Sequence, residues 1–353
     1  MNNANFTFPV LENPAPSLSL DDAEKIAEKW LDSPTGIKRL DSERDQNFYV
    51  QNAHNEGFVL KVANSKEDWG TLDFQNQALK HLAKTTTLSL PRVKSDLLGS
   101  EIATISLENE ECFVRLVTFL EGEPLGNINS ITNVQTLYSN MGTFLGHLGL
   151  GLKDLQHHSS KHKLLWDMSH TNLLYKLLPY IDNKNNRNIA QKALLYFTKH
   201  VEKPLSLQRT QVIHNDMNPD NVILQPPRTT QLAGMIDFGD MVEAPLINDL
   251  AVAASYQTVA MGDIFKGTSS MLSAYNKVYP LNSDELDLLP SLIMNRIAMS
   301  AIISEWRAKE HPGNQEYILG SIKKTWKTLE CLVEEDLGAI AIKLKNNLST
   351  SLD

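Results

Sequence analysis

Two polar loops near the middle of the chain carry the residue types that phosphoryl transfer requires. The first loop contains His214, Asp216 and Asn221 in the spacing H-x-D-x-x-x-x-N, and the second contains Asp237 in the sequence D-F-G, sixteen residues after the asparagine. Phosphoryl transfer needs one carboxylate that orients the attacking hydroxyl, and a second carboxylate with an amide oxygen to hold Mg²⁺ against the phosphates. Asp216 suits the first role, and Asn221 with Asp237 suits the second.

Short apolar segments at 212–213, 222–224 and 235–236 border these loops and read as strands. A strand with a loop at its end can fix a carboxylate in space and still leave it accessible. The alternative is a pair of ordinary polar turns, since Asn, Asp, Pro and Gly are common in turns. At average composition, both patterns arise together in this order with a chance of about one in ten thousand. The combination therefore favours the functional interpretation.

The segments HNDMNPDNVIL and GMIDFGDM resemble the aminoglycoside phosphotransferase and choline kinase family, and within it the chain is most similar to hydroxylysine kinases. Asn215 stands where protein kinases have an arginine after the histidine. The resemblance covers nearly the whole chain after residue 20. It implies a protein-kinase-like fold and transfer of the γ-phosphoryl group of ATP or GTP, with Mg²⁺, to a hydroxyl of a small molecule. It also implies that His214 belongs to the catalytic loop with Asp216 and Asn221.

A lone cation, Lys61, lies in the apolar segment 58–62, which follows a hairpin-like turn. A strand lysine often points to solvent, but this is also where the kinase fold places the lysine that binds the α- and β-phosphates. The polar turn 42–46, with Ser42 and Arg44, would then cover the nucleotide. This turn lacks the G-x-G-x-x-G sequence of protein kinases.

The partner of Lys61 is left open by the sequence. Segment 73–84 is predicted to be a helix, and most relatives have a glutamate there that pairs with the strand lysine. The matching position in this chain is Gln75. A neutral amide can accept a hydrogen bond from Lys61 without the strength of a charged partner. Asp73, two residues earlier, is the alternative.

The predicted fold class is α+β, a bilobal protein-kinase-like fold. Residues 1–120 are expected to form a nucleotide-binding lobe, a mostly antiparallel sheet with a helix. Residues 121–353 are expected to form a mainly helical catalytic and substrate-binding lobe. The segment VRLVTFLEGEPL resembles the hinge of the family, so the nucleotide is expected between the lobes. The oligomeric state is not predicted.

Only nine residues separate Gly239 from Asp249, which leaves no room for a peptide-docking segment and favours a small acceptor. The acceptor is predicted to be a small amino acid or amino alcohol, with 5-hydroxylysine as the first candidate. Two carboxylates are candidates for a substrate ammonium, and two arginines, each of which could equally be solvated or ion-paired, are candidates for a substrate carboxylate: Asp240, Glu243, Arg296 and Arg307.

Two other interpretations remain at this stage. One is a kinase for another acceptor, such as choline, an aminoglycoside, homoserine or a methylthio sugar. The other is a catalytically silent kinase-like binding protein, which Gln75 favours. The intact set of Asp216, Asn221 and Asp237 opposes the second interpretation.

The composition of the 353 residues limits the other classes of function. The formal net charge is −9, and no basic patch stands out in the sequence, which argues against a nucleic acid partner. Two isolated cysteines, Cys112 and Cys331, suggest a reducing compartment, and the cytoplasm is expected. We expect no signal peptide, because no basic residue precedes Lys25, and no membrane span, because the uncharged run 250–262 is too short.

Overall fold

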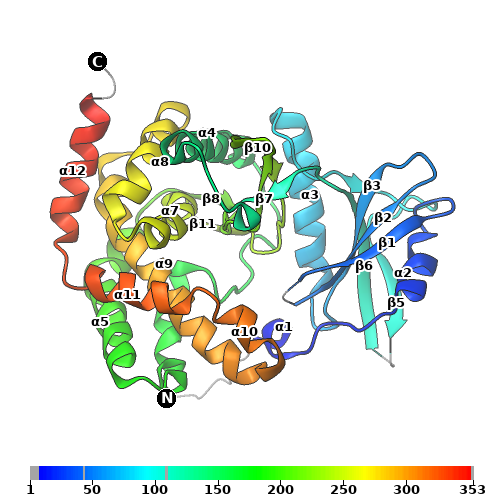
Figure 1. Cartoon of the computed structure of the whole chain (residues 1–353), viewed down its shortest axis with the longest axis horizontal. Helices are drawn as coiled ribbons and strands as arrows, with labels where there is room; N and C mark the ends of the chain where they lie inside the picture. The colour runs from blue at the N-terminus through cyan, green and yellow to red at the C-terminus, as the bar shows by residue number, and fades with distance from the viewer. Residues whose placement is uncertain (1–7, 43, 108–109, 351–353) are drawn as a thin grey trace. The chain divides into compact units, whose positions relative to one another are not determined.

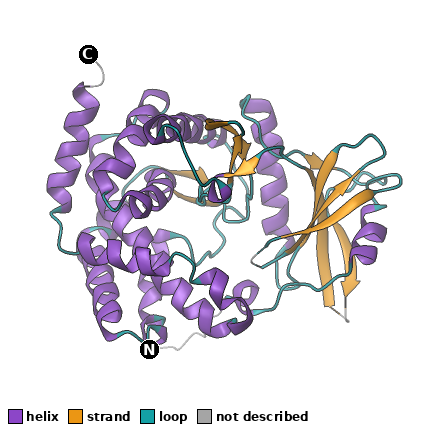
Figure 2. Ribbon diagram, viewed as in Figure 1, coloured by secondary structure: helices purple, strands orange, loops and turns teal. Residues whose placement is uncertain are grey.

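The computed structural model describes residues 8–42, 44–107 and 110–350. The chain divides into two compact units. The N-terminal unit comprises Met1–Glu121 with His157–Ser160, and the C-terminal unit comprises Gly122–Gln156 with Lys161–Asp353. Strands dominate the first unit and helices the second, as Figure 1 and Figure 2 show and as the sequence predicts.

The N-terminal unit is built on an antiparallel sheet. In the described residues it has six strands in the order β1-β2-β3-β6-β4, with β5 also pairing with β6. The strands are β1 (Thr35–Leu40), β2 (Gln46–Gln51), β3 (Gly57–Val62), β4 (Val93–Lys94), β5 (Ala103–Leu107) and β6 (Glu110–Thr118). Three helices accompany them: α1 (Pro9–Glu12), α2 (Leu20–Ala27) and α3 (Trp69–Thr85).

The two faces of this sheet differ in character. Phe58, Leu60 and Val62 alternate along β3 and are buried in a core that also contains residues of α2. Period-two alternation sends the intervening residues to the other face. Lys61 is therefore on the opposite face, in register with Arg115 of β6, and Arg115 reaches residues of α3.

The C-terminal unit contains two small sheets among its helices. One has the strand order β10-β9-β7, and the other pairs β11 with β8. The strands are β7 (Glu123–Pro124), β8 (Thr210–Ile213), β9 (Val222–Gln225), β10 (Arg228–Met235) and β11 (Val242–Pro245). The helices are α4 (Val134–Leu152), α5 (Lys184–His200), α6 (Glu202–Leu205), α7 (Ile247–Met261), α8 (Ile264–Val278), α9 (Ser283–Glu310), α10 (Gln315–Ile318), α11 (Ile322–Leu332) and α12 (Leu337–Thr350), with short 3-10 turns at Leu125–Asn127, Met168–Lys176, Leu178–Tyr180 and Pro312–Asn314.

Helix α9 is the central helix of this unit. Among the described residues it alone has the length and hydropathy of a membrane-spanning helix, and 83% of that stretch is buried inside the protein. Burial on all sides is typical of a core helix in a folded domain. Both arginines of interest on α9 are buried, Arg296 at 1% exposure and Arg307 at 4%.

Helices α7 and α8 approach each other closely at Gly267. A Cβ atom at this position would lie 2.7 Å from the backbone nitrogen of Thr258 and 2.8 Å from the carbonyl carbon of Gln257, both on α7. Since backbone atoms cannot rotate away, only a glycine allows this approach. The position of α7 therefore depends on Gly267.

We predict that Gly267→Ala lowers the free energy of unfolding by about 1–3 kcal/mol, because the added methyl group must push α8 away from α7. Gly313→Ala is the control, since a Cβ there meets no atom of the described part of the chain within 4 Å. Chemical denaturation of the two variants measures the difference. Equal stability of both variants would show that the close approach does not constrain α7.

Candidate active site

Strand register brings the two polar loops together in the C-terminal unit. Val222 of β9 pairs with Met235 of β10, and the Ile236 N–H donates to the Asn221 carbonyl at 2.9 Å. Asp237 follows Ile236 directly, so it lies just beyond the end of the β9–β10 hairpin, next to Asn221. At the other end of the loops, Val242 of β11 pairs with Ile213 of β8. The predicted grouping of the two loops is therefore present in the structure.

Two non-glycine residues of these loops have left-handed backbone conformations. Asn215 has φ of +65° and Asp237 has φ of +56°. Asn and Asp tolerate this region better than most residues, but it persists only where the surroundings hold it. The Asn215 N–H donates to Asp249 Oδ1 at 2.8 Å, and the Gly239 N–H donates to Asp237 Oδ1 at 3.1 Å. Carboxylates thus fix the shape of both loops.

Asp249 holds the first loop through its side chain. It lies in the first turn of α7 and is 1% exposed, and its carboxylate accepts backbone N–H groups of the first loop. Burial raises the pKa of Asp249 to about 6. Its main role is to connect α7 to the loop that carries Asp216.

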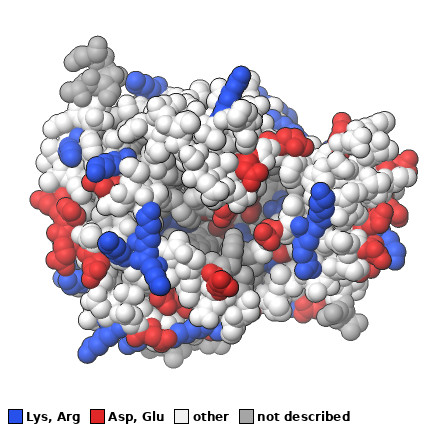
Figure 3. All heavy atoms as spheres, in the orientation of Figure 1, with Lys and Arg blue, Asp and Glu red and all other residues white. Residues whose placement is uncertain are grey.

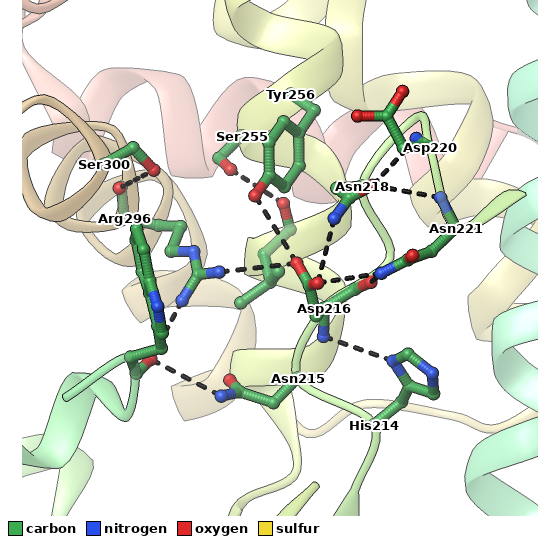
Figure 4. Close-up of polar contacts among 12 residues, drawn as sticks. His214, Asn215, Asp216, Asn218, Asp220, Asn221, Ser255, Tyr256, Arg296 and Ser300 are labelled. Atoms are coloured by element: carbon green, nitrogen blue, oxygen red, sulfur yellow. Dashed lines mark hydrogen bonds and ion pairs between the residues drawn. The ribbon is translucent and has the colours of Figure 1, made fainter. Parts of the chain in front are cut away.

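The Asp216 carboxylate has different partners on its two oxygens (Figure 4). Oδ2 accepts from the side-chain amides of Asn218 at 2.9 Å and Asn221 at 2.8 Å. Oδ1 has longer contacts, 3.5 Å to the Tyr256 hydroxyl and 3.7 Å to Arg296 Nη2. The side chain retains 17% exposure, so the carboxylate is held and accessible at once.

The surroundings of Asp216 disfavour its charge. Burial is the largest cause and raises its pKa to about 7, and the nearby carboxylates of Asp240 and Asp237 act in the same direction. Arg296 and the Asn218 hydrogen bond oppose this shift. The carboxyl group therefore titrates near neutrality, as expected for a group that exchanges protons.

His214 joins the two loops from inside the protein. It is fully buried, which lowers its pKa to about 4, and the imidazole is therefore neutral. Its Nδ1 accepts from the Asp216 N–H at 3.3 Å, so the ring proton is on Nε2. The ring packs edge-on against Phe238 of the second loop at 4.7 Å. This geometry gives His214 a positioning role.

Asn221 and Asp237 form a suitable pair of ligands for Mg²⁺. Both hydrogen bonds of the Asn221 amide nitrogen go to Asp216, to the carbonyl at 3.0 Å and to Oδ2 at 2.8 Å, which directs the amide oxygen away from Asp216. Among the described residues, no group of three or more His, Cys, Asp or Glu side chains could hold a metal. Mg²⁺ characteristically uses one or two protein oxygens and completes its shell with phosphates and water, so this sparse set fits it.

Both predicted partners of Lys61 have other contacts in the N-terminal unit. The Gln75 side-chain oxygen accepts from Arg115 Nη2, and Arg115 Nη1 donates to Asn76 Oδ1 at 3.1 Å. Asp73 contacts His157 Nε2 at 3.2 Å and accepts from Gln77 at 3.2 Å. Arg115 is buried and was missed by the sequence analysis. Gln75 therefore binds Arg115, which is the residue opposite Lys61 on the adjacent strand.

The turn expected to cover a nucleotide connects β1 to β2. Ser42 is exposed and Arg44 is half-buried, whereas Glu43 lies outside the described residues. The Arg44 carbonyl accepts from the Asn64 side chain at 3.3 Å, and Asp45 Oδ1 accepts from the Asn64 N–H at 3.2 Å. Asn64 thus anchors this turn to the end of β3, near Lys61 in the chain.

Arg296, a candidate ligand for a substrate carboxylate, is buried among residues of the C-terminal unit. Its guanidinium stacks on the Trp166 ring at 4.7 Å from the centroid, donates from Nη1 to the Trp166 carbonyl at 2.9 Å, and lies beside Asp216. Because it is 1% exposed and bound to these partners, its contacts favour the ion-paired alternative over direct binding of a substrate carboxylate.

The three other candidate substrate residues are also placed in the C-terminal unit. Arg307 lies three helical turns beyond Arg296, about 16 Å along α9, and burial lowers its pKa to about 10, so it remains protonated. Asp240 is half-buried and close enough to raise the pKa of Asp216. Glu243 pairs with Lys161 at 3.2 Å. A single small molecule at Asp216 can reach Asp240 more readily than Arg307.

Tyr256 lies 3.5 Å from Asp216 Oδ1 and was missed by the sequence analysis. It follows Asp249 by seven residues, which is close to two helical turns, so both side chains are on the same side of α7. This periodicity is the signal that could have identified it. Trp166 is a second residue that the sequence analysis missed, and the next residue, Asp167, caps the 3-10 turn that follows by accepting from the Ser169 N–H at 2.9 Å.

A profile described as the phosphotransferase enzyme family matches residues 36–269 of the chain. The chain belongs to the phosphotransferase enzyme family. Among curated proteins, hydroxylysine kinase of Mus musculus is 26% identical over 332 residues, covering 87% of this chain and 86% of that protein. This phosphotransferase is therefore an enzyme of the small-molecule kinase type, as the loop motifs predict.

Solved structures confirm the predicted protein-kinase-like fold class. A microcompartment-associated aminopropanol kinase is 14% identical with a TM-score of 0.69, covering 94% of this chain and 99% of that one. The amicoumacin kinase hAmiN, solved with AMP-PNP, is 13% identical with a TM-score of 0.68, covering 91% and 96%. At these identities the likeness concerns the fold.

We predict that Asp249→Ala lowers the free energy of unfolding by about 1–3 kcal/mol, because buried N–H groups of the first loop lose their acceptor. It should also reduce phosphoryl transfer, because Asn215 and then Asp216 lose their fixed positions. Asp263→Ala is the matched control, since it removes a carboxylate that accepts the Lys266 N–H at 2.8 Å at the start of α8. Similar activity of the two variants would contradict the role of Asp249 in the loop.

Proposed function

We propose that the enzyme transfers the γ-phosphoryl group of ATP or GTP, with Mg²⁺, to a free hydroxyl of a small amino acid or amino alcohol such as 5-hydroxylysine. The observation that carries the proposal is the arrangement of Asp216, whose carboxylate is bound by the amide of Asn221 and adjoins the loop of Asp237. The names of the curated relatives and the absence of a peptide-docking segment support the choice of acceptor.

In the proposed reaction, the ionised Asp216 carboxylate accepts a hydrogen bond from the acceptor hydroxyl. The hydroxyl oxygen bonds to the γ-phosphorus, the bond to the β-phosphate oxygen breaks, and the hydroxyl proton passes to Asp216. A pKa near 7 suits this role, because the carboxylate can accept the proton and release it afterwards. Mg²⁺, held by Asn221 and Asp237, would neutralise the charge of the phosphates.

The N-terminal unit is proposed to bind the nucleotide, with residues 1–120 as its lobe and 121–353 as the catalytic and substrate lobe. Lys61 would bind the α- and β-phosphates, and Ser42 and Arg44 would cover them. Gln75 would act indirectly, since its oxygen is bound to Arg115 beside Lys61. The buried cation Arg115 adds positive charge to the lysine face, which favours a polyphosphate.

The acceptor is proposed to carry an ammonium group. Asp237 and Asp240 lie close enough to Asp216 to raise its pKa, and this cluster of three carboxylates attracts a cation. Asp240 is the proposed ammonium ligand, with Glu243 as a second candidate that must first leave Lys161. Arg307 remains the candidate for a more distant carboxylate.

The proposed setting is a reducing compartment such as the cytoplasm. Both cysteines are free thiols, Cys112 buried and Cys331 exposed. On the face of the described residues that Figure 3 shows, basic side chains are interspersed with acidic ones, without a continuous basic patch. This distribution supports nucleotide and small-molecule partners over nucleic acid.

We predict that Asp216→Asn lowers kcat by about 10²-fold or more, because the amide cannot accept the hydroxyl proton. Folding and the KM for the nucleotide should change little, since the amide preserves the shape of the side chain. Asp220→Asn, an exposed position of the same loop, is the matched control. Steady-state kinetics test this, and an Asp216→Asn enzyme with half the wild-type rate would rule out the role.

We predict that Asp237→Ala abolishes activity, whereas raised Mg²⁺ partly restores Asn221→Ala. The reason is that Asp237 carries the charge that a hard cation prefers, and Asn221 contributes a neutral oxygen. Activity titrated against Mg²⁺ concentration separates the two variants. Full activity of Asp237→Ala at millimolar Mg²⁺ would refute the assignment.

We predict a higher kcat/KM for 5-hydroxylysine or a related hydroxylated amino acid or amino alcohol than for choline or aminoglycosides, with ATP and GTP tested separately. Lysine is the matched control, because it has the same ammonium and carboxylate groups but no side-chain hydroxyl. Release of the nucleoside diphosphate and the mass of the product report transfer. A clear preference for choline or an aminoglycoside would overturn the acceptor while leaving the kinase assignment intact.

A further inference from the structure

The two oxygens of Asp216 are not equivalent, and Oδ1 has the greater remaining capacity to accept a hydrogen bond. Oδ2 receives two short amide hydrogen bonds, at 2.8 and 2.9 Å. Oδ1 has contacts of 3.5 and 3.7 Å, both longer than the usual 2.7–2.8 Å of an O–H···O bond and 2.9 Å of an N–H···O bond. A carboxylate oxygen accepts more than one hydrogen bond, so Oδ1 keeps capacity for a donor.

Tyr256 places a hydroxyl group next to this oxygen. It projects from α7, is half-buried, and lies 3.5 Å from Oδ1 (Figure 4). Burial and the nearby Asp216 carboxylate raise the pKa of Tyr256 to about 12, so the phenol keeps its proton and can donate it to a hydrogen bond. A second hydroxyl group beside Oδ1 could therefore donate to Oδ1 and accept from Tyr256.

Arg296 fixes the other side of the same oxygen. Its side chain is 1% exposed, stacks on Trp166, and donates to the Trp166 carbonyl, while Nη2 faces Oδ1. The same carbonyl accepts from the Asn215 side chain at 3.4 Å, so Trp166 ties Arg296 to the loop that carries Asp216. The planar fork of an arginine makes the two contacts from separate nitrogens while it stacks on the Trp166 ring, whereas a lysine has a single nitrogen and no flat face.

We propose that the acceptor hydroxyl binds between Asp216 Oδ1 and the Tyr256 hydroxyl, and that Arg296, held on Trp166, is a positioning residue that keeps Oδ1 directed at this site. The inference rests on the proposed kinase function, and it adds two residues, on α7 and α9, to the recognition of the acceptor. It replaces the role of carboxylate ligand that the sequence suggested for Arg296.

The arrangement selects a hydroxyl over an ammonium group at Oδ1. An ammonium has no lone pair with which to accept from Tyr256. The Arg296 guanidinium would also repel a cation placed at Oδ1, since its Nη2 is 3.7 Å away. In a substrate that carries both groups, the ammonium is therefore directed away from Oδ1, and the hydroxyl takes the reacting position.

The test compares Tyr256→Phe with Tyr275→Phe, a tyrosine of α8 whose buried hydroxyl has no hydrogen-bond partner among the described residues. Loss of one hydrogen bond to the acceptor should lower kcat/KM for the acceptor by about 3- to 10-fold, with the nucleotide KM unchanged. Tyr275→Phe should match the wild type. Arg296→Lys, which keeps the charge but not the fork, should lower kcat by about 10- to 100-fold with the nucleotide KM again unchanged.

The measurement uses the acceptor that the wild-type enzyme phosphorylates fastest, so an error in the proposed acceptor class does not affect it. If no acceptor is phosphorylated, Mg²⁺-dependent nucleotide hydrolysis provides the same comparison, because water then occupies the place of the hydroxyl. Wild-type kinetics of Tyr256→Phe would overturn the inference. So would a rise in nucleotide KM with an unchanged acceptor kcat/KM, or an Arg296→Lys effect that appears only as lower thermal stability.

Discussion

The carboxylate of Asp216 is the constraint on which the rest of the site depends. A carboxylate that is largely removed from water is stable only if donors and cations replace the solvent. Three parts of the C-terminal unit supply these groups: Asn218 and Asn221 from the loop, Tyr256 from α7 and Arg296 from α9. Because the partners come from separate helices, the packing of those helices determines the position of the reacting oxygen.

The small sheets solve a second problem, which is to hold polar loops in unfavourable backbone conformations. The β9–β10 register places Asn221 next to the residue before Asp237, and β11 pairs with β8 to close the loops from the other side. Asp249 then binds the backbone where Asn215 has its left-handed conformation. The paired strands and the buried Asp249 carboxylate thus hold both loops in their left-handed backbone conformations.

The sequence was most informative where the chemistry is local. His214, Asp216 and Asn221 lie within one loop, and the D-F-G segment follows the next hairpin, so spacing predicted the grouping, and the family resemblance of these segments implied the fold class. It failed for partners far apart in the chain. Arg296 and Trp166 are 130 residues apart, and α9 is buried on all sides, so no periodicity indicated which way Arg296 points. The pairing of Gln75 with Arg115, 40 residues apart, depends on how α3 packs against β6, and the β3–β6 register then places Arg115 beside Lys61.

Burial and neighbouring carboxylates hold Asp216 ready to exchange a proton near neutral pH. Carbon-13 NMR of the aspartate carboxyl groups in the metal-free protein tests it most directly, with the Asp216 signal assigned by its absence in Asp216→Asn. We expect a signal that titrates with a midpoint at about 7, well above the ordinary aspartate value. A midpoint near 4 would show that Asp216 behaves as a solvated carboxylate, and it would contradict the account.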